Sequence, residues 1–199
     1  MSAREEILSR IRIRRLHSAP TVPDFAPPAL ANPIEMFVAR AQRANAELHF
    51  LDSEIDVPHT IAWLLRARNL PAIVHVPPHA SALPWDTAPG LTLHRGAPGP
   101  DDAAVALAPF GIAETGTLVY ASTAGAPASW HFRAGFEIAV VRADAILPHM
   151  ENAIAVLKAS GLPSTINFVT GPSRTGDIEQ TLELGAHGPK ALAILIVQN

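Results

Sequence analysis

The 199-residue sequence contains no cysteine. Disulfide bonds, thiolate nucleophiles, cysteine-ligated zinc sites and iron–sulfur clusters ligated by cysteines of this sequence are therefore excluded. No apolar run approaches the roughly 20 residues that a membrane-spanning helix needs. The opening residues, MSAREEIL, are charged and periodic rather than an apolar signal segment. The resulting expectation is a cytoplasmic protein without a membrane span.

Charge is also sparse, because only 17% of the residues are charged whereas 48% are hydrophobic. The formal net charge of -3 provides no basic field that would hold nucleic acid by its phosphates, so nucleic acid is not an expected partner. The high apolar content argues against disorder. With this length it predicts one ordinary domain with a sizeable core.

A proline-rich stretch separates an N-terminal helix from the rest of the sequence. Residues 2–16 carry capping-box spacing at Ser2 and Glu5 and an apolar stripe, which predict a helix. Residues 18–33 contain five prolines and predict an extended connector. We therefore divide the chain into an N-terminal helix with its connector, residues 1–32, and a single α/β domain, residues 33–199.

Apolar runs alternate with helical patterns over most of the chain. Runs without in/out alternation predict buried strands at 72–76, 103–108, 118–120, 136–142 and 191–197, with further strands at 48–51, 91–94 and 166–170. Helical periodicity predicts helices at 33–48, 57–68 and 145–160. This alternation is typical of an α/β fold with a largely parallel sheet covered by helices on both faces.

A single carboxylate stands among small and apolar residues in GIAETGTLVYAS, residues 111–122. Burying Glu114 there is costly unless its carboxylate is hydrogen-bonded. Gly116 permits a close backbone approach, and Thr115 and Thr117 supply hydroxyl groups. One interpretation is a strand–turn–strand lip that binds a ligand, with Glu114 as a catalytic residue at its centre. The alternative is that Glu114 caps backbone amides within a β-turn.

The second informative segment is INFVTGPSRTGDIE, residues 166–179. A strand is expected to end at Gly171, and a helix is expected to begin near residues 175–177. A helix N-terminus offers free amides to an anion, and Arg174 adds a planar donor fork while Ser173 and Thr175 add hydroxyls. These residues predict an anion site. The alternative is a simple helix cap with Arg174 paired to a nearby carboxylate.

The histidines give weaker signals. His187 lies in the turn GAHGP, residues 185–189, where it either contacts the same ligand or acts as a general acid or base. The alternative is that it only stabilises the turn. His75 and His79 are separated by two prolines, which prevent one helix face from presenting both, so no metal site is predicted. Residues 130–132, Trp-His-Phe, form either a lid or an anchor for the loop that contains them.

Together these motifs resemble the lactate utilisation protein C family (LutC/YkgG), which is built on the LUD domain. The matching segments are AREEIL at 3–8, IAETGTLV at 112–119, GPSRTGDIE at 171–179 and GAHGP at 185–189. The resemblance implies an α/β fold of the NagB/RpiA/CoA-transferase-like group. It also implies a role in oxidising L-lactate to pyruvate together with iron–sulfur partner proteins, with the clusters in those partners and no cofactor in this chain.

The sequence departs from the family pattern at Pro109-Phe110 and at residues 128–136, which flank the expected pocket. A second hypothesis is a stand-alone CoA-transferase-like or sugar-phosphate-binding enzyme. In that hypothesis Glu114 would be the nucleophile or base, and Arg174 would hold the anion.

Overall fold

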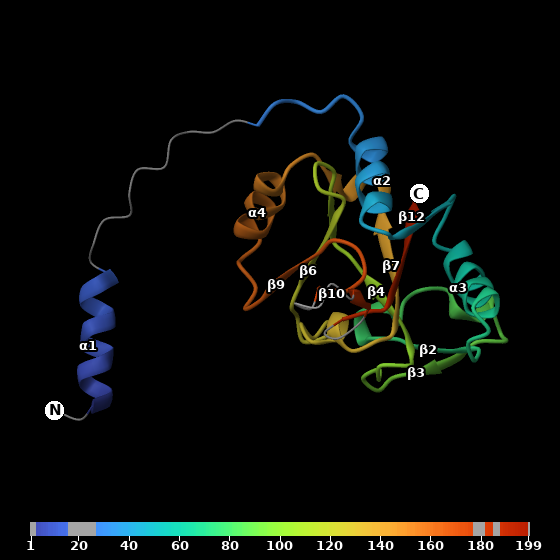
Figure 1. The fold of residues 1–199 in the computed structure, drawn as a ribbon, viewed down its shortest axis with the longest axis horizontal. Coiled ribbons are helices and arrows are strands. Elements are labelled where there is room, and N and C mark those ends of the chain that lie inside the picture. Colours follow the sequence, from blue (N-terminus) through green and yellow to red (C-terminus); the bar gives the residue numbers. More distant parts are fainter. Residues whose placement is uncertain (1–2, 16–26, 177–181, 185–187, 199) are drawn as a thin grey trace.

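The computed structural model describes residues 3–15, 27–176, 182–184 and 188–198. Its α-helices within these ranges, shown in Figure 1, are α1 (Ala3–Arg15), α2 (Pro33–Arg43), α3 (Asp56–Ala67) and α4 (Met150–Ala159). In the described ranges, no helix combines the length and the apolar character that crossing a bilayer requires. The expected helix at the N-terminus is confirmed, whereas the domain division at residue 33 stays a prediction.

The centre of the described fold is a six-stranded sheet in which every pair of neighbouring strands is parallel. Its order is β1-β12-β7-β4-β2-β3. The strands are β1 (Glu47–Leu51), β2 (Ile73–His75), β3 (Thr92–His94), β4 (Ala103–Leu107), β7 (Phe136–Arg142) and β12 (Ala191–Val197). The central strands β7 and β12 are almost continuously buried, as expected for parallel strands that are covered on both faces.

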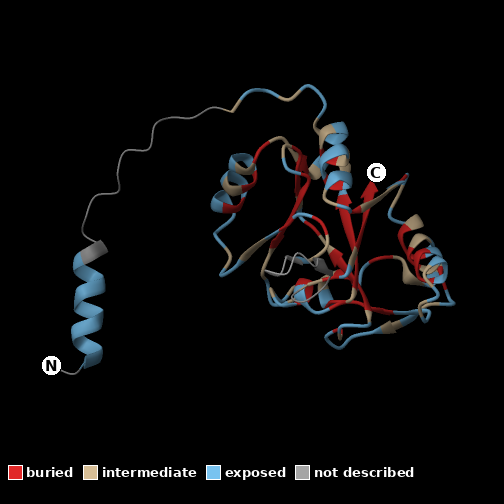
Figure 2. Ribbon diagram, in the orientation of Figure 1, coloured by how far each residue is buried: buried red, intermediate tan, exposed pale blue. Residues whose placement is uncertain are grey.

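Alternate residues of the central strands enter two different cores. Val105 of β4 and Ile138 of β7 pack with α3 on one face, in a core that includes Leu64. Ala104 and Ala139 face the other way, into a core with the buried residues of α2. Figure 2 shows the buried residues concentrated in the strands between these layers. The prediction of a largely parallel sheet with helices on both faces is confirmed.

A second, four-stranded sheet covers the same face as α2. Its order is β8-β5-β6-β9, and the strands are β5 (Phe110–Ile112), β6 (Thr117–Ala121), β8 (Ile146–Leu147) and β9 (Ile166–Val169). Strand β6 is antiparallel to both β5 and β9. Leu118 and Tyr120 of β6 enter the core shared with the six-stranded sheet, whereas Val119 packs against α4 on the outer side. The sequence did not predict this sheet.

Helix α4 begins at Met150, five residues later than expected. Residues 146 and 147 instead pair with β5 as strand β8. A proline disfavours helical backbone in the residue before it, so Pro148 keeps Leu147 extended. His149 remains extended as the N-cap, with φ -130° and ψ 160°.

The helix expected near residues 175–177 is not formed at residues 175 and 176. Residues Arg174–Gly176 form strand β10, which pairs in antiparallel fashion with β11 (Leu182–Leu184). Residue 177 lies outside the described residues. The strand therefore replaces the helix N-terminus whose free amides were expected to attract an anion.

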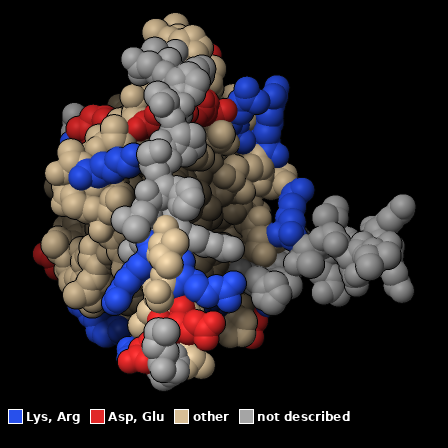
Figure 3. All heavy atoms as spheres, turned by 90° about the vertical axis from the view of Figure 1, so that its left-hand side faces the viewer, with Lys and Arg blue, Asp and Glu red and all other residues tan. Residues whose placement is uncertain are grey.

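Charged side chains on the face shown in Figure 3 are of both signs and lie in separate small groups. This arrangement agrees with the formal net charge of -3. That nucleic acid is not a partner stays a prediction.

Candidate functional site

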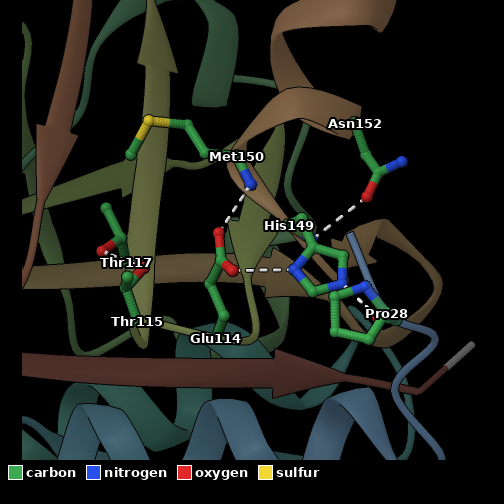
Figure 4. Close-up of polar contacts among 7 residues, drawn as sticks. All are labelled: Pro28, Glu114, Thr115, Thr117, His149, Met150 and Asn152. Carbon is green, nitrogen blue, oxygen red and sulfur yellow. Dashed lines mark hydrogen bonds and ion pairs between the residues drawn. The ribbon is translucent and has the colours of Figure 1, made fainter. Parts of the chain in front are cut away.

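Glu114 lies in the turn between β5 and β6 and reaches the beginning of α4 (Figure 4). One carboxylate oxygen, Oε1, accepts a hydrogen bond of 3.0 Å from the backbone N–H of Met150. The other, Oε2, lies 2.7 Å from Nδ1 of His149. Glu114 therefore caps the first turn of α4, which favours the capping interpretation of the motif over a ligand lip. The partner amide belongs to a helix, not to the β-turn itself.

The ring of His149 is held between two acceptors. Nδ1 contacts the Glu114 carboxylate, and Nε2 lies 2.7 Å from the carbonyl oxygen of Pro28 in the proline-rich connector. Because neither partner can donate, both ring nitrogens must carry protons, and the imidazolium form fits this site. The side chain of His149 is almost fully buried, and its backbone N–H donates to Oδ1 of Asn152, which completes the cap (Figure 4).

The ion pair shifts the pKa of each partner. The hydrogen bond from His149, and then the one from the Met150 amide, lower the pKa of Glu114. The hydrogen bond to Glu114, and then the one to the Pro28 carbonyl, raise the pKa of His149. The carboxylate contribution to stability is present above the ordinary carboxyl pKa and disappears as the pH falls through the lowered one. The imidazolium contribution is present below the ordinary imidazole pKa and disappears as the pH rises through the raised one.

We therefore expect Glu114→Gln to destabilise the protein most between about pH 5 and pH 6.5, where both partners are charged. The amide can still accept from the Met150 N–H, so the substitution isolates the charge. Urea unfolding of wild type and variant across pH 3 to 9 measures the difference, which should shrink towards both extremes. Asp144→Asn is the control, because the pair of Asp144 with Arg142 is exposed and contributes little. A stability difference between wild type and Glu114→Gln that does not change with pH would contradict the ion pair between Glu114 and His149.

The two predicted segments do meet, through hydroxyl groups. Oγ1 of Thr117 donates to Oγ1 of Thr115 at 2.7 Å and lies 2.6 Å from Oγ1 of Thr170, the residue before Gly171. The contact joins β6 to the end of its neighbour β9 in the four-stranded sheet. The two segments are therefore neighbours on the four-stranded sheet, and a ligand site shared by Glu114 and Arg174 stays a prediction.

The glycines of both motifs pack against the C-terminal end of α2. Gly116 has φ +68°, and a Cβ atom there would lie 2.3 Å from the backbone nitrogen of Ala41. Gly171 has φ +76°, and its Cβ would lie 2.2 Å from the carbonyl oxygen of Ala44. The absence of a side chain at both positions thus serves close packing of the chain on itself.

The remaining predicted residues lie around β10. The backbone N–H of Ser173 donates to the carbonyl of Pro189 at 2.8 Å, so that amide is not available to a ligand. Arg174 is exposed, and among the described residues none pairs with its guanidinium. The backbone of Thr175 pairs with Glu183, and its side chain is not described. His187 lies outside the described residues, so its role stays a prediction.

A pocket lies elsewhere, at the carboxyl ends of the parallel strands. It has a volume of about 540 Å³. Leu107 ends β4, and Val140 and Arg142 lie at the end of β7, while Glu54 follows β1 and His79 follows β2. Ligands of open α/β sheets bind at this edge. The lining residues are Glu54, His79, Ala82, Leu83, Leu107, Ala108, Pro109, Ala121, Thr123, Ala126, Val140, Arg142 and Ala145.

One wall of the pocket is a loop, residues 122–135, that is anchored in the core. Nε1–H of Trp130 donates to the carbonyl of Val105 at 3.1 Å. His131 stacks on the ring of Tyr120, with centroids 3.6 Å apart, and its Nδ1 lies 3.2 Å from Oε1 of Glu137. Trp130 and His131 are buried, so this segment is an anchor rather than a lid.

The anchor includes a buried carboxyl group that sequence reasoning missed. Glu137 of β7 is 1% exposed, and its Oε1 also accepts a 2.8 Å hydrogen bond from the hydroxyl of Tyr120. Burial raises the pKa of Tyr120 well above its ordinary value, with the Glu137 charge as the second cause. The network joins β6 of the four-stranded sheet to β7 of the six-stranded sheet. A lone charged residue inside an otherwise apolar strand run was its signal in the sequence.

Comparison with known proteins identifies the C-terminal half. The family model described as the LUD domain matches residues 100–197. Residues 100–197 are therefore similar to a LUD domain. Lactate utilization protein C of Geobacillus kaustophilus is 38% identical over 98 residues, which cover 47% of this chain and 41% of that protein. Lactate utilization protein C of Bacillus subtilis is 37% identical over 93 residues, covering 44% of this chain and 39% of that protein. The predicted family resemblance is confirmed.

The fold has a counterpart among solved structures. A crystal structure of a DUF162 family protein from Deinococcus radiodurans superposes with a TM-score of 0.59. The superposition covers 86% of this chain and 99% of that chain, at 20% sequence identity. This likeness shows a shared α/β fold. The curated relatives, by contrast, are matched over less than half of their own length.

The segment that matches the LUD domain supplies only part of the pocket. It contributes the ends of β4, β6 and β7, from Leu107 to Ala145. Glu54, His79 and Leu83 come from the region before the matched residues. The pocket therefore combines residues of the segment that matches the LUD domain with residues that precede this segment.

Proposed function

We propose that this chain takes part in lactate utilisation as a component without an iron–sulfur cluster. It works with cluster-bearing partner proteins in the oxidation of L-lactate to pyruvate. The observation that supports the proposal is the 38% identity between its LUD domain region and a lactate utilization protein C. Because the sequence has no cysteine, cysteine ligands for a cluster must come from another chain.

The proposal includes a small anionic ligand, for which Arg174 is the best-placed predicted residue. Its exposed guanidinium has no partner among the described residues. The turn before it is fixed by the hydrogen bond between Ser173 and Pro189. A planar guanidinium held next to a fixed backbone binds a carboxylate in bidentate fashion. Without a helix N-terminus, the binding energy depends on this side chain.

The alternative of a stand-alone enzyme with Glu114 as nucleophile receives less support. Both oxygens of its carboxylate are engaged, one by His149 and the other by the Met150 amide. Attack on a substrate would break the cap of α4. We therefore retain Glu114 as a structural residue in the proposal.

Growth on L-lactate tests the proposal. A strain that lacks only this chain is expected to lose growth on L-lactate, to grow normally on pyruvate and to recover with the wild-type gene. Arg174→Gln should restore growth only partly, whereas Arg66→Gln, at an exposed arginine of α3, should restore it fully. Undiminished growth of the deletion strain would refute the lactate role. Equal recovery by the two arginine variants would remove the anion site from the proposal.

A further inference from the structure

The pocket at the carboxyl edge of the sheet has an apolar floor. Leu83, Ala108 and Val140 are buried at its base. The walls include half-buried Leu107, Ala121, Ala126 and Ala145 together with exposed Ala82 and Pro109. A volume of about 540 Å³ lies within the range of pockets that enclose ligands of drug size. A three-carbon acid such as lactate would leave most of this apolar surface uncovered.

The rim of the pocket, formed by Glu54, Arg142 and Asp144, carries two carboxylates and one cation. Arg142 lines the pocket, but its Nε and one terminal nitrogen each donate to Asp144 at 3.1 Å, so its charge is already matched. Glu54 lines the pocket and brings a second carboxylate. The pKa of Arg142 is raised mainly by its hydrogen bonds to Asp144, and the charge of Glu54 contributes in the same direction. The rim therefore opposes an anionic ligand, because a carboxylate entering it would meet a net negative charge.

His79 offers one ring nitrogen to a ligand in the pocket. Nδ1 of His79 lies 2.8 Å from the carbonyl oxygen of Gly125, which can only accept, so Nδ1 carries the proton. The backbone N–H of His79 donates to the same oxygen at 3.3 Å. The ring is thus fixed against the loop, and the nitrogen left for a ligand is Nε2, which accepts from a hydroxyl group in the neutral ring.

We infer that this pocket binds an uncharged, largely apolar molecule with a hydroxyl group, which donates to Nε2 of His79. The apolar body of the molecule rests on the floor formed by Leu83, Ala108 and Val140. The site is separate from Arg174, and the inference does not depend on the role in lactate utilisation.

The charge and shape of the ligand can be tested with a matched pair of compounds. N-phenyl-1-naphthylamine, an uncharged apolar fluorophore, serves as the reporter and is displaced from the full chain by 1-octanol or by octanoate. We expect octanol to bind about tenfold more tightly than octanoate, because the carboxylate loses its hydration beside Glu54 and Asp144. Binding of octanoate at least as tight as that of octanol would overturn the inference, as would failure of the fluorophore to bind.

Variants then locate the site. Ala126→Phe fills the pocket and should weaken octanol binding by about tenfold, whereas Ala124→Phe, in the same loop but outside the lining, should leave it unchanged. Ala145→Phe, on another element, repeats the test if Ala126→Phe fails to fold. Unchanged octanol binding in the folded lining variant would overturn the inference.

Two further variants test the polar contacts. The double variant Glu54→Gln, Asp144→Asn removes the rim carboxylates and should narrow the preference for octanol over octanoate by about threefold or more. His79→Asn keeps a donor for Gly125 but removes the acceptor corresponding to Nε2, and should weaken octanol binding by about threefold. An unchanged preference would refute the argument from rim charge, and unchanged octanol binding in His79→Asn would refute the assigned hydroxyl contact.

Discussion

Replacement of Gly171 by alanine is expected to destabilise the fold by about 3 kcal/mol or more. Two costs add at this position. The backbone has φ +76°, which a residue with a Cβ atom adopts with strain. The new methyl group would also lie 2.2 Å from the carbonyl oxygen of Ala44 at the end of α2. Backbone cannot move aside as a flexible side chain does, so β9 and α2 would have to separate.

Gly161→Ala is the matched control for this prediction. Gly161 also has a positive φ, +93°, but a Cβ atom there would have nothing within 4 Å. Gly161→Ala should therefore lower the free energy of unfolding only through backbone strain, by about 1 kcal/mol. Urea unfolding followed by circular dichroism gives both free energies of unfolding. Equal losses in the two variants would show that the contact with Ala44 carries no cost.

Glu137→Ala is expected to destabilise the protein by about 3 to 5 kcal/mol. The substitution leaves a cavity between the two sheets and removes the acceptor shared by Tyr120 and His131. Both of those side chains are buried, so their polar groups would lose their partner without gaining water. Because His131 belongs to the loop that lines the pocket, we also expect the loop to become more susceptible to proteolysis.

Conservative variants separate the cavity from the hydrogen bonds. Tyr120→Phe removes one hydrogen bond and should cost about 1 kcal/mol. Glu137→Gln keeps an acceptor for the tyrosine and should cost much less than Glu137→Ala. In a double-mutant cycle, Tyr120→Phe should have little further effect once Glu137 is alanine. Additive losses in that cycle would refute the direct coupling of these two side chains.

The central strands were predictable because their burial leaves a strong pattern. Strands β7 and β12 occupy 136–142 and 191–197, the same residues that the apolar runs indicate. The edge and outer elements were harder to assign. Residues 117–121 are as buried as a central parallel strand, yet they belong to the second, mixed sheet. A strand buried on both faces carries no local signal of whether its neighbour runs parallel or antiparallel.

The site illustrates the same limit. The sequence allowed Glu114 to be a cap, but the groups it contacts, at His149 and Met150, lie 35 and 36 positions away. No spacing rule connects them. The pocket is assembled from segments that follow β1, β2, β4, β6 and β7, so only the arrangement of the strands brings these segments together. Pro109, which departs from the family pattern, lines this pocket.

Strand β12 lies between β1 and β7, so one of the last segments of the sequence joins the first strand to the middle of the sheet. Glu47 pairs with Ala193, and Leu51 pairs with Val197. During synthesis, β1 cannot form its pairing with β12 until residues 191–197 have left the ribosome. Until then, the apolar side chains of β1 lack this partner strand. Such long-range closure predicts slow folding and a need for chaperone protection of the nascent chain.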